Sequence, residues 1–141
     1  MSERLSGLLN IAMPSCPCGS DRDYARCCQP YLVGQANPES PEILMRSRYT
    51  AYTMADIDYI QKTQRGKAAV GFNALDACVW AKRVTWIKLE ILSANLENSK
   101  KGYVEFVATF VDGYRSQAMH EKSEFIKKSG QWFYVDGIQV P

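Results

Sequence analysis

Tyr103-Val-Glu-Phe-Val-Ala-Thr-Phe110 is the stretch of this sequence that decides the fold, because its side chains alternate in character along its whole length. One face carries Val104, Phe106, Ala108 and Phe110, and the other carries Tyr103, Glu105 and Thr109. A period of two with one apolar face is typical of a strand that covers a core on one side and meets solvent on the other. The stretch therefore predicts an antiparallel sheet with one covered face.

The same alternation continues on both sides of this strand and is interrupted at residues that favour tight turns. The predicted elements around it are strands over residues 85–93, 117–127 and 132–136, and turns over 98–102, at Asp112-Gly113 and at Ser129-Gly130. Short turns between consecutive strands indicate hairpins. We therefore expect about four antiparallel strands.

Three helices are predicted upstream of the sheet, and each begins after a residue that caps helix N-termini. They span residues 41–55, 57–63 and 74–83, and their caps are Ser40, Asp56 and Asn73. Proline at the first helical position supports the start of the first helix. The fold class that follows is α+β, with the helices preceding the sheet.

Length and composition agree with one ordinary domain and a small additional module. The chain has 141 residues, of which 46% are hydrophobic and 23% charged, so it has the material for one hydrophobic core. Five of the six prolines lie before residue 42. We therefore divide the chain into a module of residues 1–35 and a domain of residues 36–141.

Charge and hydropathy exclude two classes of partner. The formal net charge of +2 is far from the strongly basic balance of nucleic-acid-binding domains. No stretch has the roughly eighteen apolar residues of a membrane span. The apolar residues before Pro14 are too few and too mixed with polar ones for an export signal. We expect a cytoplasmic protein with no nucleic-acid partner and no membrane partner.

Four of the five cysteines form the spacing Cys-x-Cys-x8-Cys-Cys, at Cys16, Cys18, Cys27 and Cys28. Four thiolates suit one tetrahedral zinc ion that has no open position for water, so the predicted zinc is structural. A disulfide between the adjacent Cys27 and Cys28 would be strained. A redox-active or iron-bound cluster is the alternative. Cys78 stands apart and is expected to be a small buried residue.

Two groups of residues resemble known families. One group resembles the SEC-C zinc motif and consists of Cys-Pro-Cys-Gly-Ser at residues 16–20, the aromatic Tyr24 and the pair Cys27-Cys28. The other group resembles the bacterial YchJ family. It consists of Leu-Met-Arg-Ser-Arg-Tyr-Thr-Ala-Tyr at residues 44–52, His-Glu at 120–121, Ser123, Phe125 and Gly-Gln-Trp-Phe-Tyr-Val-Asp-Gly at 130–137. The resemblance implies a curved, cystatin-like or nuclear-transport-factor-two-like antiparallel sheet that wraps on the helices and often encloses a pocket. A small zinc-binding finger (residues 16–28) precedes it.

The SEC-C resemblance also implies that the finger recognises a protein partner. Family members often carry a second finger after the sheet, whereas this sequence stops at Pro141, so we expect a single finger to make the contact. Between its cysteine pairs the finger has two acidic and two basic residues. Four thiolates and one zinc ion would also bring the formal net charge from +2 to about zero, which leaves no attraction for polyanions.

Two charged residues fall on positions that face the predicted core. Arg48 lies in the middle of the apolar arc of the first helix, and Glu121 shares the inward face of its strand with Ser123. A buried carboxylate needs a partner, so we expect an ion pair between Arg48 and Glu121. Ser123 and a hydroxyl of Tyr49 or Tyr52 complete the expected network. The network either fixes the helix to the sheet or lines a ligand pocket in which Glu121 is an acid or base.

These features predict a non-enzymatic zinc-binding protein. The finger would be a structural or recognition module, and the pocketed domain would bind a protein or a small ligand. The alternative is a small-molecule hydrolase or isomerase that acts in the cavity around Glu121, Ser123 and Arg48. His120, the only histidine, shares the solvent face of Lys122, and we assign it an exposed structural role.

The cysteine pattern predicts the metal content of the purified protein. We expect about one equivalent of zinc, as four-thiolate structural sites hold one ion. Replacing both Cys27 and Cys28 by Ser should remove the zinc, whereas Cys78→Ser should leave it in place. Elemental analysis of the three proteins measures this directly, and unchanged zinc in the double variant would contradict the assignment.

Overall fold

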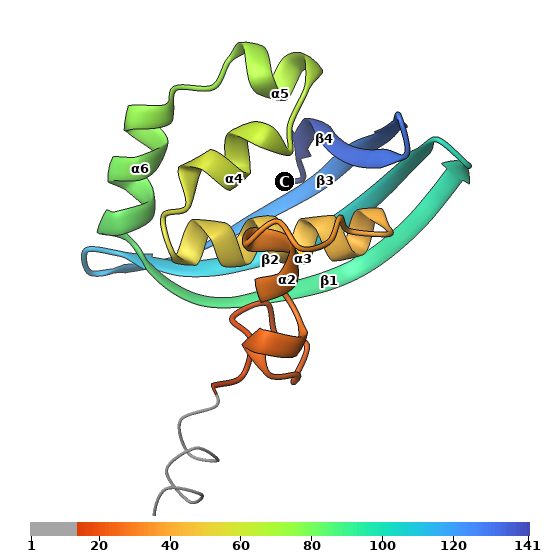
Figure 1. Cartoon of the computed structure of the whole chain (residues 1–141). Coiled ribbons are helices and arrows are strands. Elements are labelled where there is room, and N and C mark those ends of the chain that lie inside the picture. The colour runs from red at the N-terminus through yellow and green to blue at the C-terminus, as the bar shows by residue number, and fades with distance from the viewer. Residues whose placement is uncertain (1–13) are drawn as a thin grey trace, which may run out of the picture.

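The computed structural model describes residues 14–141, so the stretch before Pro14 that bears on an export signal lies outside it. The elements are η1 (Tyr24–Arg26), α2 (Gln29–Leu32), α3 (Pro41–Thr53), α4 (Ile57–Lys62), α5 (Gly66–Val70), α6 (Ala74–Arg83), β1 (Thr85–Asn98), β2 (Lys101–Asp112), β3 (Arg115–Lys128) and β4 (Gln131–Gln139). The sheet curves around the helices, and the finger projects beyond β1 (Figure 1). Within the described part, no helix is long and apolar enough to cross a membrane.

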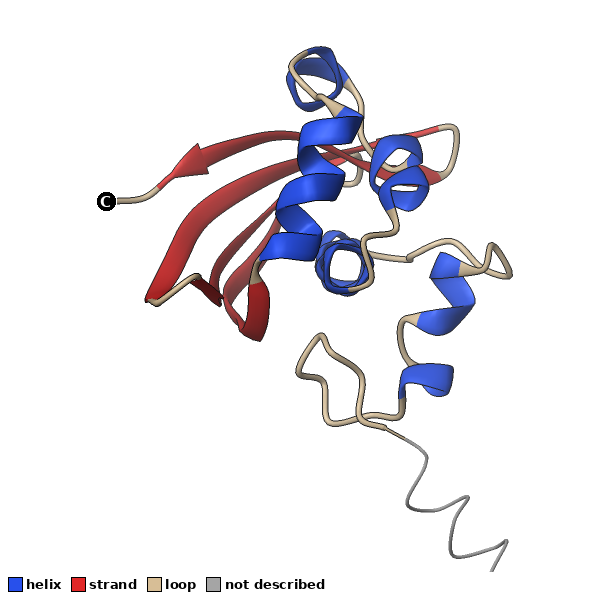
Figure 2. Ribbon diagram, turned by 90° about the vertical axis from the view of Figure 1, so that its left-hand side faces the viewer, coloured by secondary structure: helices blue, strands red, loops and turns tan. Residues whose placement is uncertain are grey.

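The four strands form one antiparallel sheet in the order β1-β2-β3-β4, so every strand pairs with its neighbour in sequence. Short turns make this possible, and Ser129 and Gly130 both adopt the positive φ that the turn between β3 and β4 requires. Figure 2 shows the helices packed on one side of this curved sheet. The α+β class and the curved antiparallel sheet are confirmed.

The predicted caps are present at all three predicted helices. Ser40 Oγ accepts a hydrogen bond from the N–H of Ile43 at 3.2 Å, which starts α3. Asp56 and Asn73 cap α4 and α6 in the same way, through their side-chain oxygens. The short helix α5 was not predicted, because five residues beginning with glycine carry no apolar periodicity.

The core lies between α3 and the concave face of the sheet. Its buried members include three of the four predicted inward residues of β2, together with side chains of α3, β1, β3 and β4; they are Leu44, Met45, Tyr49, Leu89, Val104, Phe106, Ala108, Phe125 and Trp132. Glu121 and Ser123 are buried on the same face of β3, as predicted, whereas Lys122 is exposed. The alternation of the sequence therefore places the right residues inside along β2 and β3.

The segment between α4 and α5 extends the far side of the sheet. Tyr134 N donates to Thr63 O at 2.9 Å, and Arg65 N donates to Tyr134 O at 2.9 Å. Gln64 thereby forms a parallel bridge with Tyr134 of β4. This pairing covers part of an edge that would otherwise be open, and it brings the end of α4 close to the polar residues of β3.

A bulge in β1 changes which side chains reach the core. Trp86 pairs with Phe110 and Leu89 pairs with Ala108, with a register shift between Trp86 and Lys88. One extra residue in the strand places Trp86 and Leu89 on the same face although they are three positions apart. Ile87, which strict alternation groups with Leu89, is instead 53% exposed.

The bulge predicts a large effect for one of two neighbouring substitutions and a small effect for the other. Trp86→Ala should lower the free energy of unfolding by about 3 kcal/mol, because it removes a large ring from the core. Ile87→Ala should change it by less than about 0.5 kcal/mol, because the side chain is on the surface. Urea titrations of both variants measure the difference, and a larger loss for Ile87→Ala would show that the strand alternates without a bulge.

Candidate functional site

The four clustered cysteines form a compact group of sulfurs. All four Sγ atoms lie within 4.8 Å of one another, with 3.5 Å between those of Cys18 and Cys27 and 4.0 Å between those of Cys27 and Cys28. A tetrahedral ion with metal–sulfur bonds near 2.3 Å requires sulfurs about 3.8 Å apart. The cysteines are free and buried. The donor set and its geometry therefore fit one four-coordinate metal ion.

Local turns of the finger bring these sulfurs together. Gly19 has a φ of +81°, as its place after the first cysteine pair predicts, and its N–H donates to Cys16 O at 3.2 Å. The turn η1 then returns Cys27 and Cys28 to the first pair. Ser20 lies in the same loop, directly after Gly19. Its hydroxyl accepts from the N–H of Arg22 at 3.2 Å and lies 3.1 Å from Cys27 Sγ.

Packing four thiols together makes their ionisation interdependent. The hydrogen bond with Cys16 lowers the pKa of Cys18, whereas hydrogen bonds with Cys16 and Cys18 raise the pKa of Cys28. Burial raises the pKa of Cys27. Four adjacent negative charges need a cation, so metal binding would release the remaining protons.

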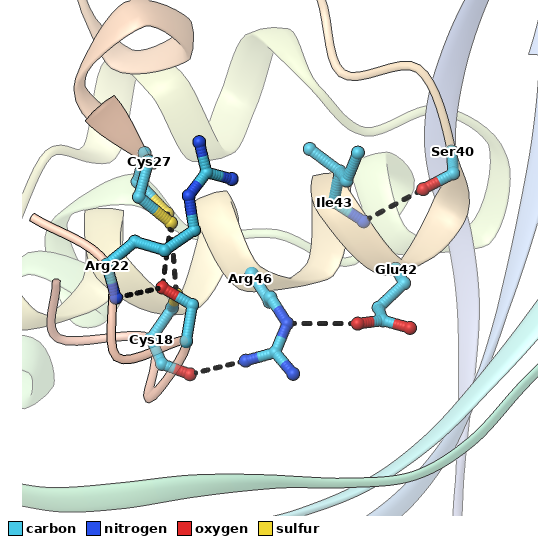
Figure 3. A network of polar contacts seen from close by, with 9 residues as sticks. Cys18, Arg22, Cys27, Ser40, Glu42, Ile43 and Arg46 are labelled. Carbon is cyan, nitrogen blue, oxygen red and sulfur yellow. Dashed lines mark hydrogen bonds and ion pairs between the residues drawn. The ribbon is translucent and has the colours of Figure 1, made fainter. Parts of the chain in front are cut away.

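The finger is fastened to α3 by polar contacts. Arg46 donates from Nη1 to Cys18 O at 2.7 Å and from Nε to Glu42 Oε2 at 3.1 Å (Figure 3). Thr50 Oγ1, one turn further along α3, lies 3.7 Å from Cys16 Sγ. The spacing of four residues between Glu42 and Arg46 is a sequence signal for their ion pair, whereas the contact of Arg46 with the finger has no local signal in the sequence.

The finger also lies against the free edge of the sheet. A Cβ added at Gly19 would stand 3.3 Å from the carbonyl oxygen of Leu89 in β1. Within the part of the chain that the structure describes, β1 is an edge strand that pairs only with β2. The loop that follows the first cysteine pair therefore covers part of this edge.

Cys78 lies on α6 and does not belong to the cysteine cluster. It is half-buried rather than buried as predicted, because α6 covers the core with only part of its surface.

The predicted ion pair between Arg48 and Glu121 is wrong. Arg48 is 3% exposed, as expected, but its guanidinium donates to Ile60 O at 3.0 Å, to Thr63 Oγ1 at 2.8 Å and to Gln64 Oε1 at 3.0 Å. These acceptors lie at the end of α4, which the chain brings within reach of α3. The arginine is satisfied by neutral oxygens, and burial lowers its pKa from the usual value.

Glu121 is held by hydroxyl groups. Its Oε2 accepts from Ser123 Oγ at 2.6 Å and from Tyr134 Oη at 3.0 Å, and its Oε1 accepts from Gln139 Nε2 at 3.4 Å. Ser123 belongs to the network, as predicted, but the tyrosine is Tyr134 rather than Tyr49 or Tyr52. A Cβ at Gly137 would overlap both the Tyr134 hydroxyl and the Glu121 carboxylate, so the glycine makes room for this group.

Tyr134 connects the two charged residues. Its hydroxyl holds Glu121, while the Arg48 guanidinium carbon lies 4.5 Å from the centre of its ring. Burial raises the pKa of Tyr134 and the neighbouring Glu121 raises it further, so the hydroxyl stays protonated and can donate. The charges of Arg48 and Glu121 are thus balanced across one aromatic ring.

A cavity of about 170 Å³ adjoins this network. Its lining, called here the aromatic cavity, consists of Met45, Arg48, Tyr49, Tyr52, Trp80, Trp86, Phe106, Ala108, Met119, Glu121 and Tyr134. Four of the five pocket residues predicted from the sequence line it, whereas Ser123 lies behind Glu121, fully buried. Trp80 and Trp86 were missed, because their approach depends on the packing of α6 and on the bulge in β1.

His120 lies on the opposite face of β3 from Glu121, two residues before Lys122. Its Nε2 is 2.7 Å from Glu105 Oε2 on β2, in a half-exposed pair. The pair crosses the outer face of the sheet and is outside the aromatic cavity.

The fold and the cysteine cluster define a class of protein in which a SEC-C finger precedes an NTF2-like domain. The family model of the SEC-C motif matches residues 15–30. The model described as "YchJ, middle NTF2-like domain" matches residues 40–137. The chain belongs to the YchJ family.

Individual relatives agree with this assignment. The chain is 37% identical over 125 residues to UPF0225 protein YchJ of Shigella dysenteriae serotype 1, covering 88% of this chain and 82% of the relative. A SEC-C motif containing protein from Rhodopseudomonas palustris, solved in solution, is 36% identical with a TM-score of 0.83, covering 91% of this chain and all of that one. A SEC-C motif containing protein from Psychrobacter arcticus is 28% identical with a TM-score of 0.78, over 89% and 82%.

Gly137 provides a test of the Glu121 network. Gly137→Ala should lower the free energy of unfolding by about 2 to 3 kcal/mol, because a methyl group would force the carboxylate and the Tyr134 hydroxyl apart. Gly71→Ala is the control, since a Cβ there has only Lys67 O within reach, at 3.9 Å. Chemical denaturation measures both variants. Equal, small effects would mean that the network adapts without cost.

Proposed function

We propose that this protein binds one structural zinc ion in its finger, recognises a protein partner through that finger, and binds a small ligand in the aromatic cavity without transforming it. The observation that carries the proposal is the group of four buried sulfurs within 4.8 Å of one another, fastened to α3 by Arg46. A reducing compartment, such as the cytoplasm, would keep these thiols available for the metal.

Zinc is the metal that this donor set favours. Four cysteine thiolates in tetrahedral arrangement suit zinc or iron, and zinc is the usual occupant where the site has only a structural task. The ion would be held by Cys16, Cys18, Cys27 and Cys28. It would cross-link the two ends of the finger. All four positions are filled by sulfur, so such an ion offers no place for water or substrate.

The exposed turn between the cysteine pairs is the proposed contact with a protein partner. Asp21, Arg22 and Arg26 are exposed there, on the turn between the cysteine pairs. Acidic and basic groups lie side by side, which favours a partner with a mixed polar surface over a polyanion.

Several observations support binding rather than catalysis in the aromatic cavity. Ser123 is fully buried and directs its hydroxyl to Glu121, so it does not line the cavity as a nucleophile would. The Arg48 donors are engaged by the end of α4. His120, a natural general base, lies on the other face of the sheet. The hydrolase or isomerase hypothesis therefore has less support than ligand binding.

Removal of the metal tests the structural role of the finger. A chelator should abolish amide protection in residues 14–30 while β2 and β3 keep theirs, because the core of the domain is built without the cysteines. Hydrogen exchange monitored by mass spectrometry resolves the two regions. Cys78→Ser is the matched control and should respond as the unmodified protein does.

Two results would contradict this role. Protection of residues 14–30 that persists after complete metal removal would show that the finger folds without the ion. Simultaneous loss of protection in β2 and β3 would show that the whole domain depends on it.

A further inference from the structure

The aromatic cavity has the size and the walls of a site for one small ring system. Trp80 and Trp86 meet edge to face with ring centres 5.0 Å apart, and Tyr52 lies 6.1 Å from Trp80 and 6.0 Å from Trp86. Cavities of about 150 Å³ hold a benzene-sized molecule, and this one has about 170 Å³. Rings in such walls pack best against other flat apolar groups.

One polar group in this wall has unused capacity. Among residues 14–141, Glu121 Oε2 accepts two hydrogen bonds, at 2.6 and 3.0 Å, whereas Oε1 accepts only one, from Gln139 at 3.4 Å. A carboxylate offers about four acceptor positions, and a bond of 3.4 Å is at the weak end of the normal range. Gln139 is exposed near the end of β4, so its side chain can turn to solvent and leave Oε1 to a ligand.

The charges around the cavity favour a neutral ligand. Glu121 and Arg48 both line it and balance each other across the Tyr134 ring. An organic cation would gain from the aromatic walls and the carboxylate but would meet the buried guanidinium of Arg48. An anion would meet Glu121. A neutral donor avoids both repulsions.

We infer that the aromatic cavity binds a small, neutral, flat aromatic molecule with one N–H or O–H donor, which hydrogen-bonds to Glu121 Oε1. The inference rests on the proposed ligand-binding function and specifies the chemical class of the ligand. Tyr134 and Ser123 are positioning residues in this site, since both hold the carboxylate through Oε2 and leave Oε1 to the ligand.

Three probes of similar size test this inference on the metal-loaded full chain. Indole has the aromatic body and one N–H donor, 1-methylindole lacks the donor, and benzyltrimethylammonium has a positive charge. Titrations followed by NMR can use the indole N–H signals of Trp80 and Trp86. Indole should bind about tenfold more tightly than 1-methylindole, as expected for a hydrogen bond to a carboxylate, and more tightly than the cation.

Glu121→Gln provides the matched variant, because it keeps the shape of the side chain and removes its charge. It should weaken indole about tenfold and leave 1-methylindole unchanged. If this variant does not fold, the comparison of the three probes on the unmodified protein still tests the inferred ligand class. Equal binding of indole and 1-methylindole, or stronger binding of the cation, would overturn the inferred ligand class and leave the proposed ligand-binding function standing. No shift of either tryptophan signal with any probe would overturn both.

Discussion

The buried guanidinium of Arg48 is the constraint on which the rest of the domain depends. An arginine stays charged in a protein interior, so its donors must find oxygens before the helices can pack. The oxygens are those of Ile60, Thr63 and Gln64, and this requirement fixes where α4 ends. The chain that follows then pairs with β4, and Tyr134 of β4 takes its place over the guanidinium. The hydrogen-bonding requirement of the Arg48 guanidinium thus determines how the helices pack against the sheet.

Helix α3 distributes its side chains between two neighbours, and so joins the two modules. Its inner side carries Arg48 toward α4 and β4, whereas Arg46, two residues earlier, reaches the backbone of the finger. Thr50 approaches a cysteine sulfur on the same side as Arg46. Because side chains three to four residues apart share one helix surface, a single helix of thirteen residues can serve both interfaces.

Local chemistry predicted much of the fold and of the metal site, whereas long-range pairing did not follow from the sequence. Helix starts depend on a side-chain oxygen three residues away, so Ser40 could be recognised as a cap. The four cysteines lie within one short stretch and were recognised by their spacing. The partner of Arg48 was missed because the bridge between Gln64 and Tyr134 joins segments seventy residues apart. The inward position of Trp86 was missed because a bulge breaks the period of two without a glycine to mark it.

The close approach of Gly19 to the carbonyl of Leu89 affects the tendency of the protein to associate with further copies of itself. An unprotected strand edge is a template on which another chain can add its own backbone hydrogen bonds. β1 is fourteen residues long and exposes the apolar side chains of Ile87, Leu92 and Leu96. Once uncovered, its edge can therefore pair with a strand of another molecule. A finger that keeps its shape by holding an ion shields part of that edge. Loss of the ion would therefore expose this edge and lead to self-association and lower solubility of the protein.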